Sequence, residues 1–310
     1  MLFTDVRSRM SHDHSHHISH YNRAFAIGVL LNLIFVLIEA GYGFFANSLA
    51  LLADAGHNLS DVVSLLLAWG ANVLANKAAT NKRTFGYKKS TVLASLLSSV
   101  LLIAALISIA WHAIERFNNP QPVTGMTVIA VSLIGVVINT LTALLFVQGQ
   151  KHDLNIRGAF LHMAADAAVS LGVVIAGIVI LFKNWQWVDP VVSLSIVVIV
   201  FIGTWGLFKD SLNYATDAVP KNISIEKLKQ YFLSIEHVED VHGLHVWPLS
   251  TTESALIVHL VTENNALNND FLIEVQHHLH DHFDIEHATI QVESSQGSEG
   301  CMFNHGHAHG

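Results

Sequence analysis

Two short stretches of the chain combine a histidine and an aspartate at the same spacing. In the first, DAGHNLSD, these residues are His57 and Asp61, and in the second, HMAAD, they are His162 and Asp166. Residues four apart share one face of a helix, so each pair presents an imidazole beside a carboxylate. Two such pairs facing each other would supply two nitrogen and two oxygen ligands, a set that suits a tetrahedral divalent cation such as Zn²⁺.

Both pairs lie inside long apolar segments, where ionisable groups are costly and are expected to face inward. A membrane histidine can also serve only to hydrogen-bond two helices, and for a single pair that interpretation stays open. The two pairs share one spacing, because 162 − 57 and 166 − 61 both equal 105. This repetition favours a metal site. Glu39, Asn32 and Asn139 are expected to line an access route or to bond between helices.

The composition indicates a membrane protein with a separate acidic part. Of 310 residues, 52% are hydrophobic and 13% are charged, about half the charged share of a soluble domain. Residues 1–208 carry 12 Lys and Arg against 9 Asp and Glu, whereas residues 209–310 carry 4 against 15, a net charge of −11. Such an acidic unit disfavours nucleic acid as a partner and suits cations. Cys301 is the single cysteine, so an intrachain disulfide is excluded.

The fold class that we predict is an α-helical membrane protein with six transmembrane helices, followed by a cytoplasmic α+β domain of ferredoxin-like type. Six apolar segments have about the length that a bilayer requires, at 23–45, 49–76, 84–117, 123–148, 155–182 and 188–207. The order helix, strand, strand, helix, strand is predicted at 223–235, 241–247, 254–262, 268–283 and 287–292. The predicted domains are a His-rich tail (1–22), the membrane domain (23–208), the cytoplasmic domain (209–293) and a second His-rich tail (294–310).

Basic residues predict the orientation in the membrane. The links between segments two and three and between four and five contain most of them, namely Lys77, Lys82, Arg83, Lys88, Lys89, Lys151 and Arg157. The links on the other side carry only Arg116 and Lys183. Both termini and the acidic domain are therefore expected to be cytoplasmic.

These features resemble the cation diffusion facilitator family, and most closely its bacterial zinc exporters. The resemblance rests on the six segments, the two motifs and the VHGLHVW stretch that begins at Val241, and it covers about residues 22–293. It implies a multi-pass protein of the bacterial inner membrane, which forms a homodimer through its cytoplasmic domain and membrane helices and exchanges Zn²⁺ for protons by alternating access. A further metal site between segments two and three is not predicted, because this chain has RTFGY, starting at Arg83, where some relatives have histidines.

The resemblance also implies two sets of metal ligands. The transport ligands are His57, Asp61, His162 and Asp166, a set that is similar to the zinc and cadmium branch. The ligands of a regulatory Zn²⁺ in the cytoplasmic domain are His242, His259, His287 and Glu293. For this second set, ordinary surface histidines remain an alternative. His245 and the histidines at 277, 278, 280 and 282 are expected to be structural.

The chemistry of the transport ligands favours a proton-driven exporter of cytoplasmic Zn²⁺, cadmium or related ions. Metal and protons compete for the same groups, and an unperturbed histidine titrates near ~6.5. An enzyme is not expected: an intramembrane metalloprotease would need His-Glu-x-x-His, which the sequence lacks. A membrane-bound zinc sensor that binds metal without moving it stays open as an alternative.

Overall fold

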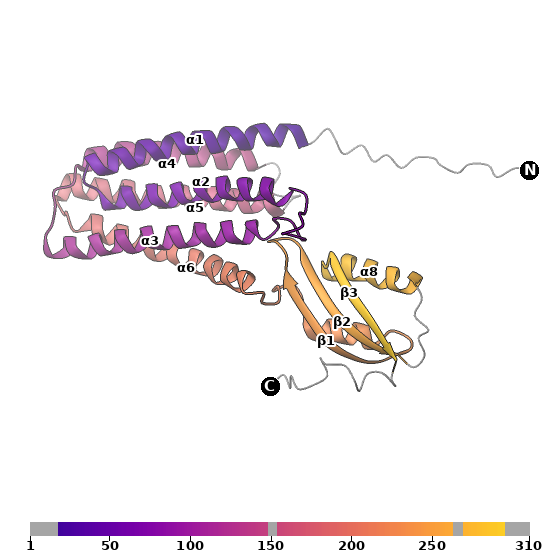
Figure 1. Ribbon diagram of the computed structural model, residues 1–310. Helices are drawn as coiled ribbons and strands as arrows, with labels where there is room; N and C mark the ends of the chain where they lie inside the picture. The colour runs from indigo at the N-terminus through magenta and orange to yellow at the C-terminus, as the bar shows by residue number, and fades with distance from the viewer. Residues whose placement is uncertain (1–17, 148–153, 263–268, 295–310) are drawn as a thin grey trace, which may run out of the picture. The chain divides into compact units, whose positions relative to one another are not determined.

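The structure is a computed structural model that describes residues 18–147, 154–262 and 269–294 (Figure 1). Most of the two predicted His-rich tails lies outside these residues. Six long helices come first, namely α1 (Ile18–Phe45), α2 (Leu49–Ala75), α3 (Ser90–Asn118), α4 (Gly125–Phe146), α5 (Leu154–Lys183) and α6 (Val188–Ala215). Within the described residues, α2 to α6 are long and apolar enough to cross a membrane, and α1 contributes the shorter apolar segment Leu33–Phe45.

Three boundaries of the long helices differ from the predicted ones by five residues or more. Helix α1 begins five residues before the predicted start at Arg23. Helix α3 begins at Ser90 and not at 84, because the preceding residues form turns in which Gly86 has a φ of +69°. Helix α6 continues past residue 207 to Ala215, since a polar sequence can remain helical after its hydropathy has fallen.

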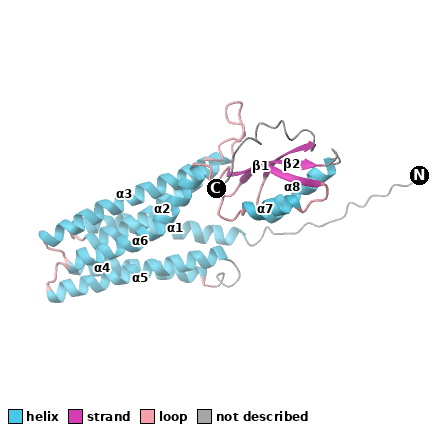
Figure 2. Cartoon of the chain, turned by 90° about the horizontal axis from the view of Figure 1, so that it is seen from below, coloured by secondary structure: helices cyan, strands magenta, loops and turns pink. Residues whose placement is uncertain are grey.

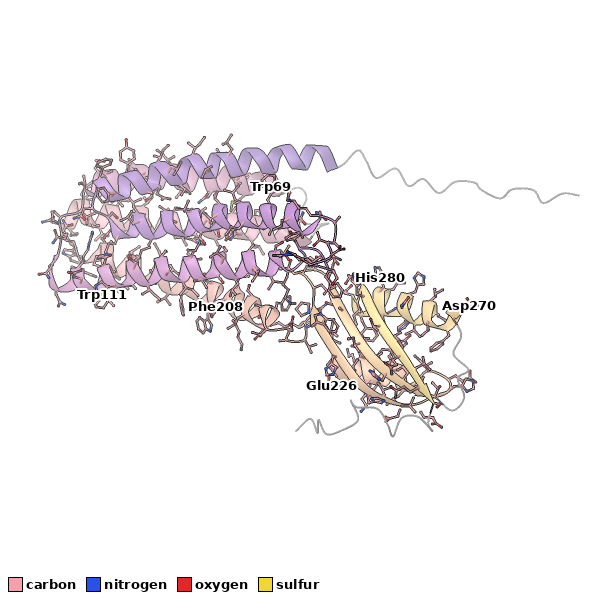
Figure 3. The ribbon with its side chains drawn as sticks, in the orientation of Figure 1. Trp69, Trp111, Phe208, Glu226, Asp270 and His280 are labelled. Atoms are coloured by element: carbon pink, nitrogen blue, oxygen red, sulfur yellow. The ribbon has the colours of Figure 1, made fainter. Side chains whose placement is uncertain are left out.

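The chain divides into two compact units, and α2, α3 and α6 continue from one into the other. The first unit takes in Ala104–Phe201 and the chain up to Val62; the second takes in Val63–Ile103 and the chain from Ile202 onward. Large side chains point outward from the helices (Figure 3). Trp69 in the second unit is 70% exposed and Trp111 in the first is 72% exposed, as suits helices surrounded by hydrocarbon.

Helix α4 packs closely along α5 within the first unit, and Figure 2 shows the two helices side by side. A Cβ atom on Gly177 would lie 2.8 Å from Cγ1 of Ile129, and one on Gly125 would lie 2.9 Å from the carbonyl oxygen of Gly177. Glycine is therefore required at both positions for this approach, as is common between membrane helices. The contact holds α5, which carries one of the two His-Asp pairs.

Asp189 of α6 forms hydrogen bonds with the start of α2. Its carboxylate is fully buried and accepts hydrogen bonds from Ser48 Oγ (2.5 Å), Leu49 N (2.8 Å) and Ala50 N (3.2 Å). Leu49 and Ala50 belong to the first turn of α2, whose backbone N–H groups have no partner within the helix, and Ser48 directly precedes it. Arg116 Nη1 lies 3.4 Å from the same carboxylate and compensates its charge. The helix that carries His57 is thereby fixed at its first turn.

We expect Asp189→Ala to destabilise the protein by about 3–5 kcal/mol, because it leaves Arg116 and the helix donors without their buried partner. Thermal unfolding in detergent measures this loss. The control is Glu115→Ala, which removes a carboxylate whose side chain is 60% exposed near the same end of α3. Equal unfolding midpoints for the two variants would contradict the structural role of Asp189.

The second unit contains a small domain with the predicted order of elements: α7 (Ile225–Leu233), β1 (Val238–Pro248), β2 (Ser254–Thr262), α8 (Asn269–Phe283) and β3 (His287–Ser294). The sheet order is β1-β2-β3, with β1 antiparallel and β3 parallel to β2. The parallel pair requires a crossover connection, which α8 provides. Figure 2 shows α7 and α8 on one side of the sheet.

The core of this domain lies between the sheet and its two helices. Leu228 and Phe232 of α7 pack there with Leu279 of α8 and with Leu256 and Leu260 of β2. Val258 joins them there, and because side chains alternate along a strand, Ile257 and His259 of β2 face the other side of the sheet. The open face of the sheet can therefore carry a polar cluster that the core does not disturb.

Candidate metal centres

Three pairs of polar side chains connect α2 and α5, and each pair lies one helical turn from the next. The closest atoms are Ser170 Oγ and Asp54 Oδ2 (2.8 Å), His57 Nε2 and Asp166 Oδ1 (3.2 Å), and His162 Nε2 and Asp61 Oδ2 (3.2 Å). Residue numbers fall along α5 as they rise along α2, so the two helices are antiparallel. Each histidine therefore meets the aspartate of the other motif.

The four predicted transport ligands lie together in the first unit. Besides the two contacts between helices, His57 Nδ1 lies 3.9 Å from Asp61 Oδ2, and His162 Nε2 lies 3.8 Å from Asp166 Oδ2. The two imidazole rings are 6.0 Å apart and nearly perpendicular, at 84°. Neighbouring ligand atoms around a tetrahedral zinc ion are about 3.4 Å apart. His57, Asp61 and Asp166 each offer a ligand atom that lies within 4.8 Å of the other two, and His162 adjoins this group through Asp61 and Asp166.

The site is buried at one end and exposed at the other. Asp54 and Ser170 are fully buried. At the next level the side chains of His57 and Asp166 are 16% and 2% exposed, and at the third level those of Asp61 and His162 are 33% and 45% exposed. The site is therefore more open at the end at which α2 continues beyond Asp61.

A second polar group adjoins the buried end. Glu39 of α1 is fully buried and accepts a hydrogen bond from Asn58 Nδ2 at 3.3 Å. Within the described part of the chain, Glu39 Oε1 and Asp54 Oδ1 have no hydrogen-bond partner. Buried carboxylates without a cationic partner must be neutralised by a proton or by a bound cation. The sequence singled out Glu39, but it did not indicate that Asn58 would hold it.

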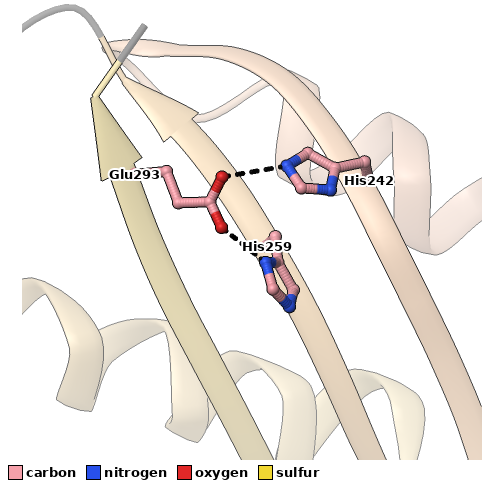
Figure 4. A group of neighbouring side chains, drawn as sticks. All are labelled: His242, His259 and Glu293. Carbon is pink, nitrogen blue, oxygen red and sulfur yellow. Dashed lines mark hydrogen bonds and ion pairs between the residues drawn. The ribbon is translucent and has the colours of Figure 1, made fainter. Parts of the chain in front are cut away.

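A further cluster lies on the open face of the cytoplasmic sheet (Figure 4). Glu293 of β3 reaches His242 of β1, with 3.2 Å between Oε2 and Nε2, and His259 of β2, with 2.6 Å between Oε1 and Nδ1. One ligand atom from each residue lies within 4.8 Å of the other two. The side chains are between 6% and 12% exposed. Two imidazoles and one carboxylate leave a fourth position of a tetrahedral metal for water or another ligand.

Gly243 makes room for this cluster. Its φ is +58°, where β1 is irregular between His242 and His245. A Cβ atom at this position would lie 3.0 Å from Cδ2 of His259. Glycine thus permits both the left-handed backbone and the close approach of the imidazole.

The structure does not bring His287 into the cytoplasmic cluster. In the parallel register His259 lies opposite Gln291, whereas His287 lies opposite Ala255. Four residues along a strand correspond to about 13 Å. The His287 ring instead lies edge-on to Phe85, at 5.8 Å. Of the four ligands predicted for this domain, three therefore lie together within the chain.

This geometry predicts different effects for two histidine substitutions. We expect zinc to slow backbone hydrogen exchange in β1, β2 and β3, because a metal that joins three strands opposes their separation. His259→Ala should remove most of this protection, while His287→Ala should preserve it. Hydrogen exchange measured by mass spectrometry on the full-length protein, with and without zinc, tests the difference. Equal protection in both variants would show that His259 is an ordinary buried histidine.

Six apolar helices with a histidine–carboxylate site among them define a multi-pass membrane protein that is suited to handling divalent metal. Residues 25–214 match the family description "Cation efflux transmembrane domain", and residues 220–295 match "Cation efflux protein, cytoplasmic domain". The chain belongs to this cation efflux family, the cation diffusion facilitators, so the resemblance predicted from its motifs is confirmed.

Two characterised relatives are similar over nearly their whole length. The cadmium, cobalt and zinc/H(+)-K(+) antiporter of Bacillus subtilis is 36% identical, with 91% of this chain and 92% of the relative covered. The zinc transporter ZitB of Escherichia coli is 37% identical, with 92% and 93% covered. A solved structure of the metal-bound C-terminal domain of the CzcD transporter from Cupriavidus metallidurans is 34% identical over 23% of this chain and 99% of that one, with a TM-score of 0.21.

Proposed function

We propose that the protein exports Zn²⁺, and with it Cd²⁺ and related divalent ions, from the cytoplasm in exchange for protons. The observation that carries this proposal is the meeting of His57, Asp61, His162 and Asp166 between α2 and α5. Two imidazoles suit borderline ions of this kind, whereas a site of carboxylates alone would suit harder ions. The names of the two relatives, a zinc transporter and a cadmium, cobalt and zinc antiporter, support the same substrates.

Proton exchange follows from the chemistry of the four ligands. They bind a metal ion when both carboxylates are ionised and both imidazoles are neutral, so metal and protons compete for the site. Without metal the ionised site would carry two negative charges, which are costly within the membrane. Protonation of these ligands removes that cost while the metal-free site returns to the state that is open to the cytoplasm. Each outward transfer of metal is thus coupled to an inward transfer of protons.

The accessible end of the site defines the direction of loading. Asp61 and His162 are its exposed residues, and from the buried pair Asp54 and Ser170 they lie in the direction of the helix ends that adjoin the Lys- and Arg-rich links. The positive charge of these links predicts that they are cytoplasmic. The exposed end of the transport site would then face the cytoplasm. Both chain termini and the acidic domain then lie on the same side, in a protein of the bacterial inner membrane.

The cytoplasmic domain is proposed to bind a regulatory zinc ion and to form a homodimer. His242, His259 and Glu293 fit the metal because two nitrogen atoms and one carboxylate converge on the open face of the sheet. The family description of this region as a cytoplasmic domain supports its place in solution. Bound metal would also reduce repulsion between two copies of an acidic domain.

Flux measurements distinguish this function from that of a membrane-bound zinc sensor. Purified protein is reconstituted into vesicles with a pH gradient, and zinc accumulation and internal pH are recorded together. The exporter moves zinc against protons and stops when the gradient is dissipated. A protein that binds zinc but transports none would establish the sensor instead.

A further inference from the structure

A stack of three rings joins the two helices of the cytoplasmic domain, away from the metal cluster on the open face. The Tyr231 ring of α7 lies parallel to that of His278 in α8, with centroids 4.1 Å apart and planes at 8°. The His278 ring lies parallel to that of His282, at 4.1 Å and 11°. These histidines are four residues apart, so they occupy one face of α8.

From this stack we propose that His278 and His282 form a second metal site in the cytoplasmic domain, which binds Zn²⁺ or another borderline divalent ion. Two histidines at this helical spacing can chelate one metal ion. The nitrogen atoms of such a pair lie about 3.4 Å apart around a tetrahedral zinc ion. The ring centroids are 4.1 Å apart, so the pair is close enough for one nitrogen of each ring to reach a shared ion once one ring has turned out of the stack.

The two imidazoles differ in burial in a way that suits chelation. His278 is half-buried and held by Tyr231, whereas His282 is exposed. Rotation about the terminal torsion of a histidine is broad and inexpensive. The exposed ring can therefore turn until its nitrogen converges with that of its fixed neighbour. Fixing one ligand in advance reduces the entropy that is lost on binding.

The direction of the pKa shift distinguishes His278 from His280 of the same helix. Burial lowers the pKa of His278, and the adjacent His282 lowers it further, which favours the neutral form that binds metal. His280 is different, because its hydrogen bond to Asp281 at 2.9 Å raises its pKa and occupies Nδ1. Among the described residues, no hydrogen bond is found to a ring nitrogen of His278 or His282.

The surrounding charge favours a cation at this position. Glu274 lies one turn before His278 and acts electrostatically on Tyr231, so a carboxylate adjoins the stack. The whole segment 209–310 carries a net charge of −11, from 4 basic and 15 acidic residues. Two protein ligands leave the remaining positions of the metal to water, so the ion exchanges readily with solution. Such a site binds metal reversibly.

Residue-resolved chemical modification of the full-length protein in detergent tests the site without any measurement of transport. Diethyl pyrocarbonate modifies free imidazole nitrogens, and peptide mass spectrometry reports the rate at each histidine. With zinc chloride at about ten times the dissociation constant, modification of His278 and His282 should slow about tenfold, in proportion to the unoccupied fraction. The rates at His277 and His280 on the same helix should change little. Equal rates with and without zinc at His278 and His282 would overturn the proposal.

Equilibrium dialysis with zinc provides the second measurement. H278A/H282A should bind one exchangeable zinc ion fewer per chain, and the matched control H277A/H280A should bind as many as the wild type. The same number of zinc ions in all three proteins would refute the site, as would an equal loss in both double variants. Should H278A/H282A fail to fold, protection from modification in the wild type still decides the question.

Discussion

Zinc transport should fall at least about 100-fold when Asp166 is replaced by alanine. Loss of groups that only support a metal ligand already costs about 10–100-fold in affinity, so loss of a ligand costs more. Asp166 is the most buried of the four ligands and contacts His57 at 3.2 Å. Its removal takes away one of two negative charges and leaves three ligands for the ion. Asp61→Ala should have a similar effect. Initial rates of zinc uptake into proteoliposomes measure both.

The controls separate loss of a ligand from loss of structure. Asp166→Asn retains the shape of the side chain but not its charge, and should be nearly as inactive. Asp270→Ala removes an exposed carboxylate at the start of α8 and should transport zinc normally. The variants must also unfold at midpoints close to that of the wild type. Near-normal flux in folded Asp166→Ala would remove this residue from the transport site.

Replacing His57 or His162 with aspartate should admit harder ions. The substitution exchanges an imidazole for a carboxylate, which suits Mn²⁺ better. We expect the ratio of Mn²⁺ to Zn²⁺ transport to rise by about tenfold, or about 1.4 kcal/mol of relative binding free energy. Competition between the two metals in proteoliposomes measures this ratio.

A matched substitution tests whether position decides the effect on selectivity. His112→Asp exchanges the same groups in α3, where the side chain is 59% exposed and is paired with Glu115. That variant should preserve the zinc preference of the wild type. An unchanged order of metals in both His57→Asp and His162→Asp would show that imidazole does not select the ion.

The sequence predicts the helices of this protein better than it predicts their ends. Hydropathy detects the apolar part of a segment, so it located the six helices. It cannot show that α6 continues through Lys209 to Ala215, because polar residues are compatible with a helix outside the membrane. For the same reason, the start of α3 was placed too early: residues 84–89 follow an apolar pattern only weakly and form turns around Gly86.

The two sets of metal ligands differ in how far the sequence could predict their positions. The His-Asp spacing within α2 and α5 fixes which face each pair occupies, and a high cost for buried charge then requires the pairs to face inward. The cytoplasmic cluster depends on strand register, which no local pattern reveals. Alternation placed His259 on the open face, but the parallel register moved His287 four residues away from it.

The proposed function requires that His57, Asp61, His162 and Asp166 together hold the transported ion. The location of bound zinc tests this requirement. An experimental structure of the zinc-loaded protein, with anomalous diffraction recorded at the zinc absorption edge, shows where the metal lies. We predict a peak between α2 and α5, within coordination distance of both imidazoles and both carboxylates. Zinc bound only elsewhere in the chain, with no peak between these helices, would contradict the account.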